Sequence, residues 1–146
     1  MIRPINNNDR DTFIKFADMF YHSEAVDHCI PIEHHAQSFD VMMQSNTYMF
    51  AYMFQVDNTS VGYALLSKTY SNEAGGLVLW IEEIFILPEY RGRGLGKEFF
   101  NFIDTISKDY TRLRLEISPC NDRAKKLYSS MGFQPLDYLQ MVNDKK

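Results

Sequence analysis

A chain of 146 residues has the length of a single domain, so we predict one domain over residues 1–146. Hydrophobic residues make up 45% of the chain and aromatic residues 14%, which is enough apolar side chain to fill a core without disulfides or metals. The net charge of −4 argues against a nucleic-acid-binding surface as the main function and is compatible with a cationic substrate.

The cysteines and the apolar runs indicate the cellular compartment in which we expect the protein. Cys29 and Cys120 form neither a disulfide framework nor a metal-binding spacing, so we expect reduced thiols in a cytoplasmic protein. The first residues include Asn and Asp where a secretion signal would have an apolar core. Since no apolar run reaches the length of a membrane-spanning helix, we expect no membrane partner.

The first half of the chain predicts a strand, two amphipathic helices and a hairpin. A short alternation of apolar and polar residues at 1–4 is typical of an edge strand, and Asn and Asp residues at 6–9 are good helix N-caps. Phe13, Phe16 and Phe20 then lie on one helical face. The remaining predicted elements are a helix at 33–44 and strands at 47–56 and 61–69, joined by a turn at 57–60.

An apolar run at 77–87 dominates the second half. Its residues, rich in Ile, Leu and Trp and followed by Pro88, suit a strand that is buried on both faces. Leu95, Phe99 and Ile103 then repeat at helical spacing. The later predicted elements are a strand at 113–118, a helix at 121–131 that Gly132 ends, and two short strands at 133–134 and 138–142. This order indicates a mixed α+β fold.

A basic, glycine-rich turn at 91–97 separates the long apolar strand from the helix that follows it. Glycines let the backbone come close to a ligand, and the free N–H groups at the start of a helix attract anions. Arg and Lys side chains in the same turn add positive charge. The turn therefore predicts an anion site, most simply a site for phosphate.

Two common glycine-rich motifs do not fit this turn. A Gly-x-Gly-x-x-Gly dinucleotide motif would need glycine where Lys97 or Phe99 stands. A Walker P-loop would need glycine at Arg91 and Ser or Thr at Glu98. The turn therefore matches neither of these two nucleotide-binding loops.

Two segments resemble the GCN5-related N-acetyltransferase (GNAT) family. Arg91, Gly94 and Gly96 form an Arg-x-x-Gly-x-Gly pattern that is similar to the family's pyrophosphate-binding motif. A downstream segment begins at Asn121, reaches Tyr128 and continues into Met-Gly-Phe, similar to the family's Asn-x-x-Ala-x-x-x-Tyr and Gly-Phe segment. The order of predicted elements is also that of the family. The resemblance implies the GNAT fold, a mixed, mostly antiparallel central sheet with helices on both faces.

The resemblance implies acetyl-CoA as co-substrate and no metal. Main-chain N–H groups at 92–97 would hold the pyrophosphate, and the strand at 84–86 would align the pantetheine arm as an added strand. A main-chain N–H near Ile84 would stabilise the thioester oxygen as charge develops on it. The residues that the resemblance assigns to acetyl-CoA are Ile84, Phe85, Ile86, Arg91, Gly92, Arg93, Gly94, Leu95, Gly96, Lys97 and Asn121.

Acetyl transfer to an amine also needs groups that move protons. A primary amine with a pKa of about 10.4 arrives protonated at neutral pH, so a carboxylate must accept its proton. Glu82 is the first candidate for this proton acceptor, by resemblance to polyamine acetyltransferases, and Glu83 is the second candidate. In a regular strand the two would point to opposite faces, whereas a bulge would change this. By resemblance, Tyr128 is the acid that protonates the leaving thiolate.

The acceptor is less well defined than the donor. Glu82, Glu83 and the acidic balance favour a small cationic amine, such as a polyamine, diamine or aminoglycoside, that attacks directly in a ternary complex. Asp27 and His28 lie in a segment that helps to wall the acceptor pocket of similar enzymes, so they are candidate substrate contacts. A peptide or protein amine is the alternative acceptor.

Other functions fit the sequence less well. Four histidines at 22, 28, 34 and 35 with Cys29 have no standard metal-site spacing. An acyl-CoA-binding sensor or partner module would keep the fold without the chemistry, but a pure binder needs neither Tyr128 nor the paired acids. Arg123, Lys125 and Lys126 are interpreted as a solvated helix face, with a minor role near the adenosine phosphate of the co-substrate as the alternative. A homodimer with the strand at 138–142 at its edge is a further expectation.

Overall fold

The computed structural model describes residues 1–26 and 28–146 and contains a five-stranded sheet with strand order β1-β2-β3-β4-β5. The strands are β1 (Ile2–Pro4), β2 (Met49–Val56), β3 (Thr59–Ser71), β4 (Gly76–Ile86) and β5 (Arg112–Leu115). The first four strands are antiparallel neighbours, and β5 runs parallel to β4. The prediction of a mixed, mostly antiparallel sheet is confirmed.

The hairpin between β2 and β3 turns on two residues. Asp57 and Asn58 both have positive φ, at 50° and 63°, which is the backbone of a type I′ turn. Asp and Asn tolerate this left-handed conformation better than most residues. The turn predicted at 57–60 is therefore present but tighter, and β3 begins already at Thr59.

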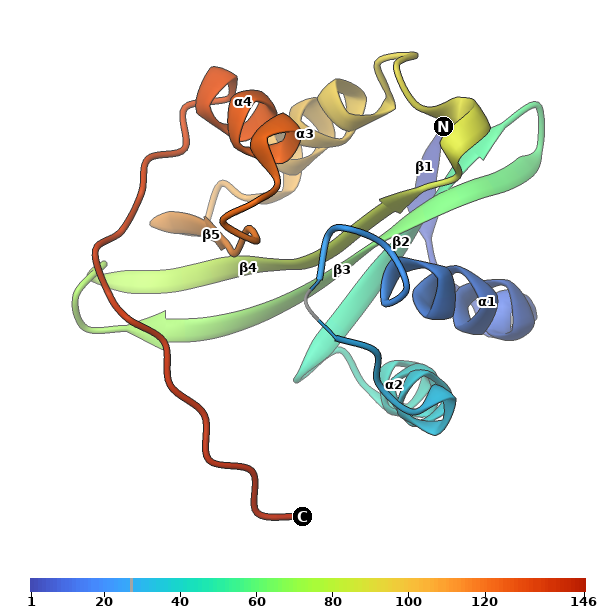
Figure 1. Cartoon of the computed structure of the whole chain (residues 1–146), viewed down its shortest axis with the longest axis horizontal. Helices are drawn as coiled ribbons and strands as arrows, with labels where there is room; N and C mark the ends of the chain where they lie inside the picture. Colours follow the sequence, from blue (N-terminus) through green and yellow to red (C-terminus); the bar gives the residue numbers. More distant parts are fainter. Residues whose placement is uncertain (27) are drawn as a thin grey trace.

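Helices cover both faces of the sheet, as predicted. Figure 1 shows α1 (Arg10–Phe20) and α2 (Ile32–Gln44) on one face, and α3 (Leu95–Ile106) and α4 (Asp122–Ser130) on the other. The longest of them, α2, has 13 residues. No helix in the described part of the chain is long and apolar enough to cross a membrane.

Each face has its own aromatic-rich core. The α1 and α2 face buries Phe13, Phe16, Phe39, Tyr63 and Phe85. On the other face, the buried residues include Phe54, Leu66, Leu79, Phe99 and Ile103. Truncating one such buried phenylalanine to alanine costs about 3–5 kcal/mol, so either layer is essential to folding.

The start of α1 is fixed by a charged cluster at the N-terminal edge of the sheet. Arg3 on β1 donates two hydrogen bonds of 2.8 Å to the two carboxylate oxygens of the buried Asp9. Asp9 also accepts from the Asn6 backbone N–H at 2.9 Å, which completes the capping box of the short 3-10 turn (Asn7–Asp9) that leads into α1. This cluster ties the first helix to the sheet.

The strand β4 has two irregularities, a bulge and an early end to its pairing with β5. β4 pairs with β3 over its whole length, but Leu65 lies opposite Glu83 while Leu66 lies opposite Ile81, so Glu82 is an extra, bulged residue. Pairing with β5 ends at Ile81 and Leu115. Beyond that point the edge of β4 that faces β5 has no strand partner among the described residues, and the two strands separate.

The prediction of strands at 133–134 and 138–142 is wrong. Residues 131–146 form no strand in the structure, and Figure 1 shows this tail leaving α4 and passing the end of the β3–β4 hairpin. Leu139, Met141 and Val142 are between 87% and 89% exposed. Apolar residues in a short run favour a strand only when a neighbouring strand supplies hydrogen-bond partners, and here the tail is anchored by Tyr138, whose hydroxyl donates to Glu73.

Candidate active site

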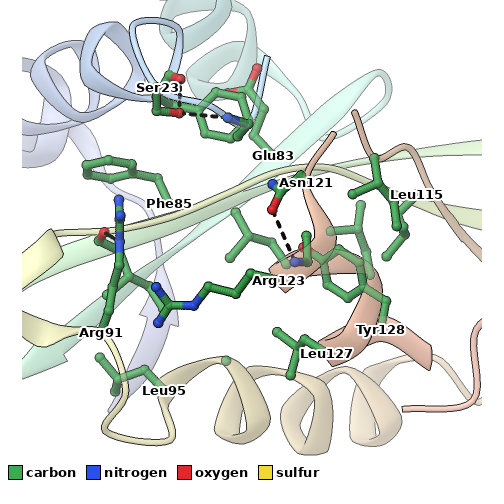
Figure 2. Close-up of a pocket in the computed structure, with 18 of the residues that line it drawn as sticks. Ser23, Glu83, Phe85, Arg91, Leu95, Leu115, Asn121, Arg123, Leu127 and Tyr128 are labelled. Atoms are coloured by element: carbon green, nitrogen blue, oxygen red, sulfur yellow. Dashed lines mark hydrogen bonds between the residues drawn. The ribbon is translucent and has the colours of Figure 1, made fainter. Parts of the chain in front are cut away.

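A cavity of about 400 Å³ lies where β4 and β5 separate. Five segments far apart in the sequence form its walls: the turn after α1, the second half of β4, the loop leading into α3, the residues after β5, and α4. Figure 2 shows Ser23 and Glu83 on the α1 side of the cavity, with Leu127 and Tyr128 on the α4 side. The cavity thus joins both faces of the sheet through the gap beside β4.

The glycine-rich loop forms one end of this cavity. Gly92 and Gly94 have φ of 74° and 84°, a backbone that disfavours any residue with a side chain. Both positions are open, with no atom within 4 Å of where a Cβ would stand. Gly94 is the N-cap of α3, so the N–H groups of the first helical turn lack partners within the helix.

Of the basic side chains near the start of α3, some line the cavity and one does not. Arg91 and Lys97 line the cavity, and Arg91 Nε donates to the Ile86 carbonyl at 2.8 Å, which leaves its terminal nitrogens free to point elsewhere. Arg123 from α4 reaches across the cavity toward Arg91 (Figure 2). Arg93 instead stacks over the Tyr90 ring at 4.9 Å and does not line the cavity. Open amides with three nearby cations fit a diphosphate group.

At the other end of the cavity, the bulge in β4 brings both acids to one face of the sheet. Glu82 accepts a hydrogen bond from the Ser67 hydroxyl, and Glu83 accepts one from the Tyr63 hydroxyl at 2.7 Å. Ser67 and Tyr63 are four residues apart on β3 and therefore on the same face. The two carboxylates lie side by side, where a regular strand would have separated them.

The two acids differ in their surroundings. Glu82 is exposed, whereas Glu83 is partly buried and accepts a second hydrogen bond of 2.6 Å from the Tyr21 hydroxyl. Burial raises the pKa of Glu83, and the nearby charge of Glu82 raises it further, while the two phenol hydrogen bonds lower it. The balance leaves the pKa of Glu83 above its ordinary value.

Two residues of the last helix line the cavity: Tyr128 lies within α4, and Asn121 is its N-cap. The Tyr128 ring packs edge-on against Phe100 and Phe133, with ring centroids 5.7 and 6.0 Å away. Burial raises the pKa of its phenol, so the hydroxyl keeps its proton at neutral pH. Asn121 caps α4 by accepting from the Ala124 N–H at 3.1 Å, which leaves its amide NH₂ available as a donor.

The structure brings together most of the residues singled out in the sequence. The cavity lining includes Glu82, Glu83, Ile84, Phe85, Ile86, Arg91, Gly92, Gly94, Leu95, Gly96, Lys97, Asn121 and Tyr128. His28 is exposed and does not line the cavity, and Asp27 lies outside the described residues. No group of three or more His, Cys, Asp or Glu residues among those described is arranged to hold a metal ion.

Sequence reasoning missed several cavity residues. Glu24 and Glu116 add two carboxylates to the lining, and Ser23 adds a hydroxyl. Arg123, expected mainly on a solvated helix face, also lines the cavity, whereas Lys125 and Lys126 do not, because the direction of each side chain depends on how α4 packs. Glu24 and Glu116 follow secondary-structure elements that approach each other only in the folded chain, and no local pattern indicates their roles.

This chain matches a protein-family model and several curated proteins. The model of the acetyltransferase (GNAT) family matches residues 15–133 of this chain. The thialysine N-epsilon-acetyltransferase of Bos taurus is 36% identical over 78 residues, which is 52% of this chain and 45% of the bovine protein. A Bacillus subtilis (strain 168) protein, provisionally named a ribosomal protein bS18-alanine N-acetyltransferase, is 32% identical over 77% of this chain and 76% of its own length. The chain spans about half the length of the thialysine acetyltransferases that it matches.

Solved structures have the same fold. A possible acetyltransferase from Clostridium difficile 630 superposes with a TM-score of 0.83 at 22% identity, over 99% of this chain and 96% of that one. An aminoglycoside N-acetyltransferase in complex with CoA superposes with a TM-score of 0.79 at 19% identity, over 100% of this chain and 95% of that one. At these identities the likeness establishes the arrangement of the elements.

Proposed function

The chain belongs to the acetyltransferase (GNAT) family, and from this premise we propose that it transfers the acetyl group of acetyl-CoA to a primary amine of a small cationic acceptor, by direct attack in a ternary complex. One observation carries the proposal. A single cavity has an amide-rich helix start with basic side chains at one end and paired carboxylates at the other. An anionic donor and a cationic acceptor would each meet the opposite charge there.

The donor end would be held by main-chain groups. The N–H groups of the first turn of α3 and of residues 92–94 face an open space that a diphosphate can enter. Arg91, Lys97 and Arg123 would supply charge-assisted hydrogen bonds around it. Acetyl-CoA supplies the acetyl group as a thioester, and the unpaired edge of β4 beyond Ile81 offers backbone partners to its arm.

Carboxylates would prepare the acceptor amine. Its ammonium form, with a pKa of about 10.4, is attracted to the acidic end but cannot attack until it loses a proton. We infer that Glu83 accepts that proton, because its raised pKa makes it a stronger base than a carboxylate of ordinary pKa. This proposal reverses the order expected from the sequence, in which Glu82 came first. Glu82, Glu24 and Glu116 would then balance the charge of the acceptor.

Tyr128 would complete the transfer. It lines the cavity from α4 and its hydroxyl stays protonated, so it would donate its proton to the thiolate that leaves. Asn121 would donate from its amide to the arm of the donor. Each step uses a group that lines the same cavity.

A peptide amine is the second candidate acceptor. The Bacillus subtilis relative, whose provisional name assigns it a ribosomal protein substrate, aligns over 77% of this chain. The third possibility, an acyl-CoA sensor without catalysis, has no cavity feature in its favour, since binding alone needs neither Glu83 nor Tyr128.

The test is a thiol-release assay with acetyl-CoA and a mixed panel of amines. The panel should contain polyamines, diamines, aminoglycosides, thialysine, lysine and short peptides with free N-termini. We expect turnover with at least one small cationic amine. Turnover confined to peptides would replace the small acceptor with the second candidate. Binding of acetyl-CoA in a calorimeter without turnover on any amine would support the sensor and refute the enzyme.

A further inference from the structure

Glu83 is held by two phenols that come from distant parts of the fold. Tyr63 on β3 donates to Oε1 at 2.7 Å, and Tyr21 donates to Oε2 at 2.6 Å from a position 62 residues away in sequence. Tyr63 is completely buried in the core, whereas Tyr21 is partly buried at the end of α1. Each carboxylate oxygen therefore has one fixed donor, and its other lone pair remains free.

A backbone hydrogen bond and two ring contacts hold Tyr21 in place. Its backbone N–H closes α1 by donating to the Ala17 carbonyl at 3.1 Å. Its ring packs edge-on against Phe20 at 5.1 Å and in a tilted arrangement against His35 on α2 at 5.5 Å. Because two neighbouring rings hold it, the hydroxyl has little freedom to leave Glu83.

The turn that carries Tyr21 is also a wall of the cavity. Phe20, Ser23 and Glu24 line the cavity, but Tyr21 does not, so Tyr21 would not touch the acceptor. Its hydroxyl reaches the site only through Glu83. A substitution at Tyr21 that keeps the ring would therefore act on the carboxylate and leave the cavity walls in place.

We infer that Tyr21 is a positioning residue for the proton acceptor: its hydroxyl fixes the orientation of the Glu83 carboxylate and sets the pH range in which that carboxylate is ionised. This inference rests on the proposed acetyl transfer for its functional meaning. Tyr21 lies outside both of the sequence segments that resemble the family. The role of Tyr21 is inferred from its hydrogen bond to Glu83 in the folded chain.

The charges around the pair determine the direction of the effect. The titratable groups near Glu83 and Tyr21 are Tyr63 on β3, Glu82 on β4, Glu116 after β5 and His35 on α2. Burial and Glu82 raise the pKa of Glu83, and the two phenols lower it. Removing the Tyr21 hydroxyl removes one stabilising donor, so the pKa of Glu83 rises further and the carboxylate is ionised only at higher pH.

The test is Tyr21→Phe, which keeps the ring and removes only the hydroxyl. We expect the acidic limb of the pH profile of kcat/KM to move up by about one pH unit, so that activity falls about tenfold below the limb and recovers at high pH. The affinity for acetyl-CoA should not change. Tyr52→Phe is the matched control: that phenol is also partly buried, lies on the other face against Phe102, and should leave the profile unmoved.

A second readout does not depend on turnover. The carboxyl carbon of Glu83, identified in a ¹³C-glutamate-labelled sample by its loss in Glu83→Gln, can be titrated by NMR in the wild type and in Tyr21→Phe. We expect the midpoint to rise in the variant. An unchanged midpoint overturns the inference whether or not the enzyme is active, and so does an unmoved acidic limb in an active enzyme. If the midpoint rises and no amine is acetylated, the positioning contact stands and the proposed function fails.

Discussion

The two ends of the cavity recognise charge in different ways. At the donor end, the backbone of residues 92–94 and the start of α3 present N–H groups, and Gly92 and Gly94 contribute by having no side chain. At the acidic end, the carboxylates of Glu82 and Glu83 lie on one face of β4, and phenols from the end of α1 and from β3 hold Glu83. The first end is a property of a short continuous stretch, whereas the second exists only after folding.

This difference separates binding from chemistry. Substitutions other than proline leave the main-chain N–H groups in place, so changes at the glycine end should weaken affinity by displacing the loop. In the proposed mechanism, a side chain at the acid end performs a step that no neighbour can take over completely. Substitutions at the two ends should therefore give different kinetic signatures, with losses in acetyl-CoA affinity at one end and losses in kcat at the other.

The largest effect is expected at Glu83. Glu83→Gln keeps the volume of the side chain and removes the base, so kcat should fall about 10²- to 10⁴-fold, as measured by steady-state thiol release. Glu82→Gln is the paired control and should cost less, because Glu82 is exposed and bonded to Ser67. A larger loss in Glu82→Gln than in Glu83→Gln would reverse the assignment of the base.

Tyr128→Phe should have the next largest effect. A thiolate with a pKa of about 8.5 leaves more readily than most groups, so loss of its acid should lower kcat only about 10- to 100-fold. The affinity for acetyl-CoA, followed by calorimetry, should stay the same, because the ring still packs on Phe100 and Phe133. Unchanged turnover across pH 6–9 would remove Tyr128 from the acid role.

Gly94→Ala tests the donor end. An alanine there is forced into a left-handed backbone, which costs about 1–2 kcal/mol or shifts the loop, and its methyl group enters the open space beside the amides. We expect affinity for acetyl-CoA to fall by about tenfold or more while kcat at saturation changes less. Gly75→Ala is a matched control, because Gly75 has φ of 74° and equally open surroundings but lies outside the cavity lining. Equal losses of affinity in both variants would attribute the effect to general instability.

The smallest effect on activity is expected at Asp9, far from both ends. Asp9→Asn breaks a charge-assisted pair with Arg3 and should lower the free energy of unfolding at pH 7 by about 2 kcal/mol in urea titrations. The Arg3 guanidinium lowers the pKa of Asp9, so this stability is present above the unfolded pKa of about 3.9 and is lost as pH falls through the lower folded value. The wild type and the variant should therefore converge in stability below about pH 4. A constant difference down to pH 2 would show that the charge of Asp9 is not the cause.

Several features could be predicted because they are local. The long strand, the glycine-rich turn and the helix after it depend on an apolar run, on glycines and on a repeat of apolar residues, and the structure has all three. The Asn121 segment likewise forms a capped helix. The tail at 138–142 shows the limit of such reasoning: its pattern favours a strand, yet no partner strand meets it in the described chain.

The sequence by itself determined the order of elements up to α4 and the donor end of the cavity, because glycine conformation and helix N–H groups are properties of a few adjacent residues. Tertiary structure decided the acceptor end. A single bulged residue in β4 turns Glu82 to the same face as Glu83, and the placement of α1 brings Tyr21 to the Glu83 carboxylate. Pairing register and helix packing depend on contacts across the whole fold, so no pattern within one segment specifies them.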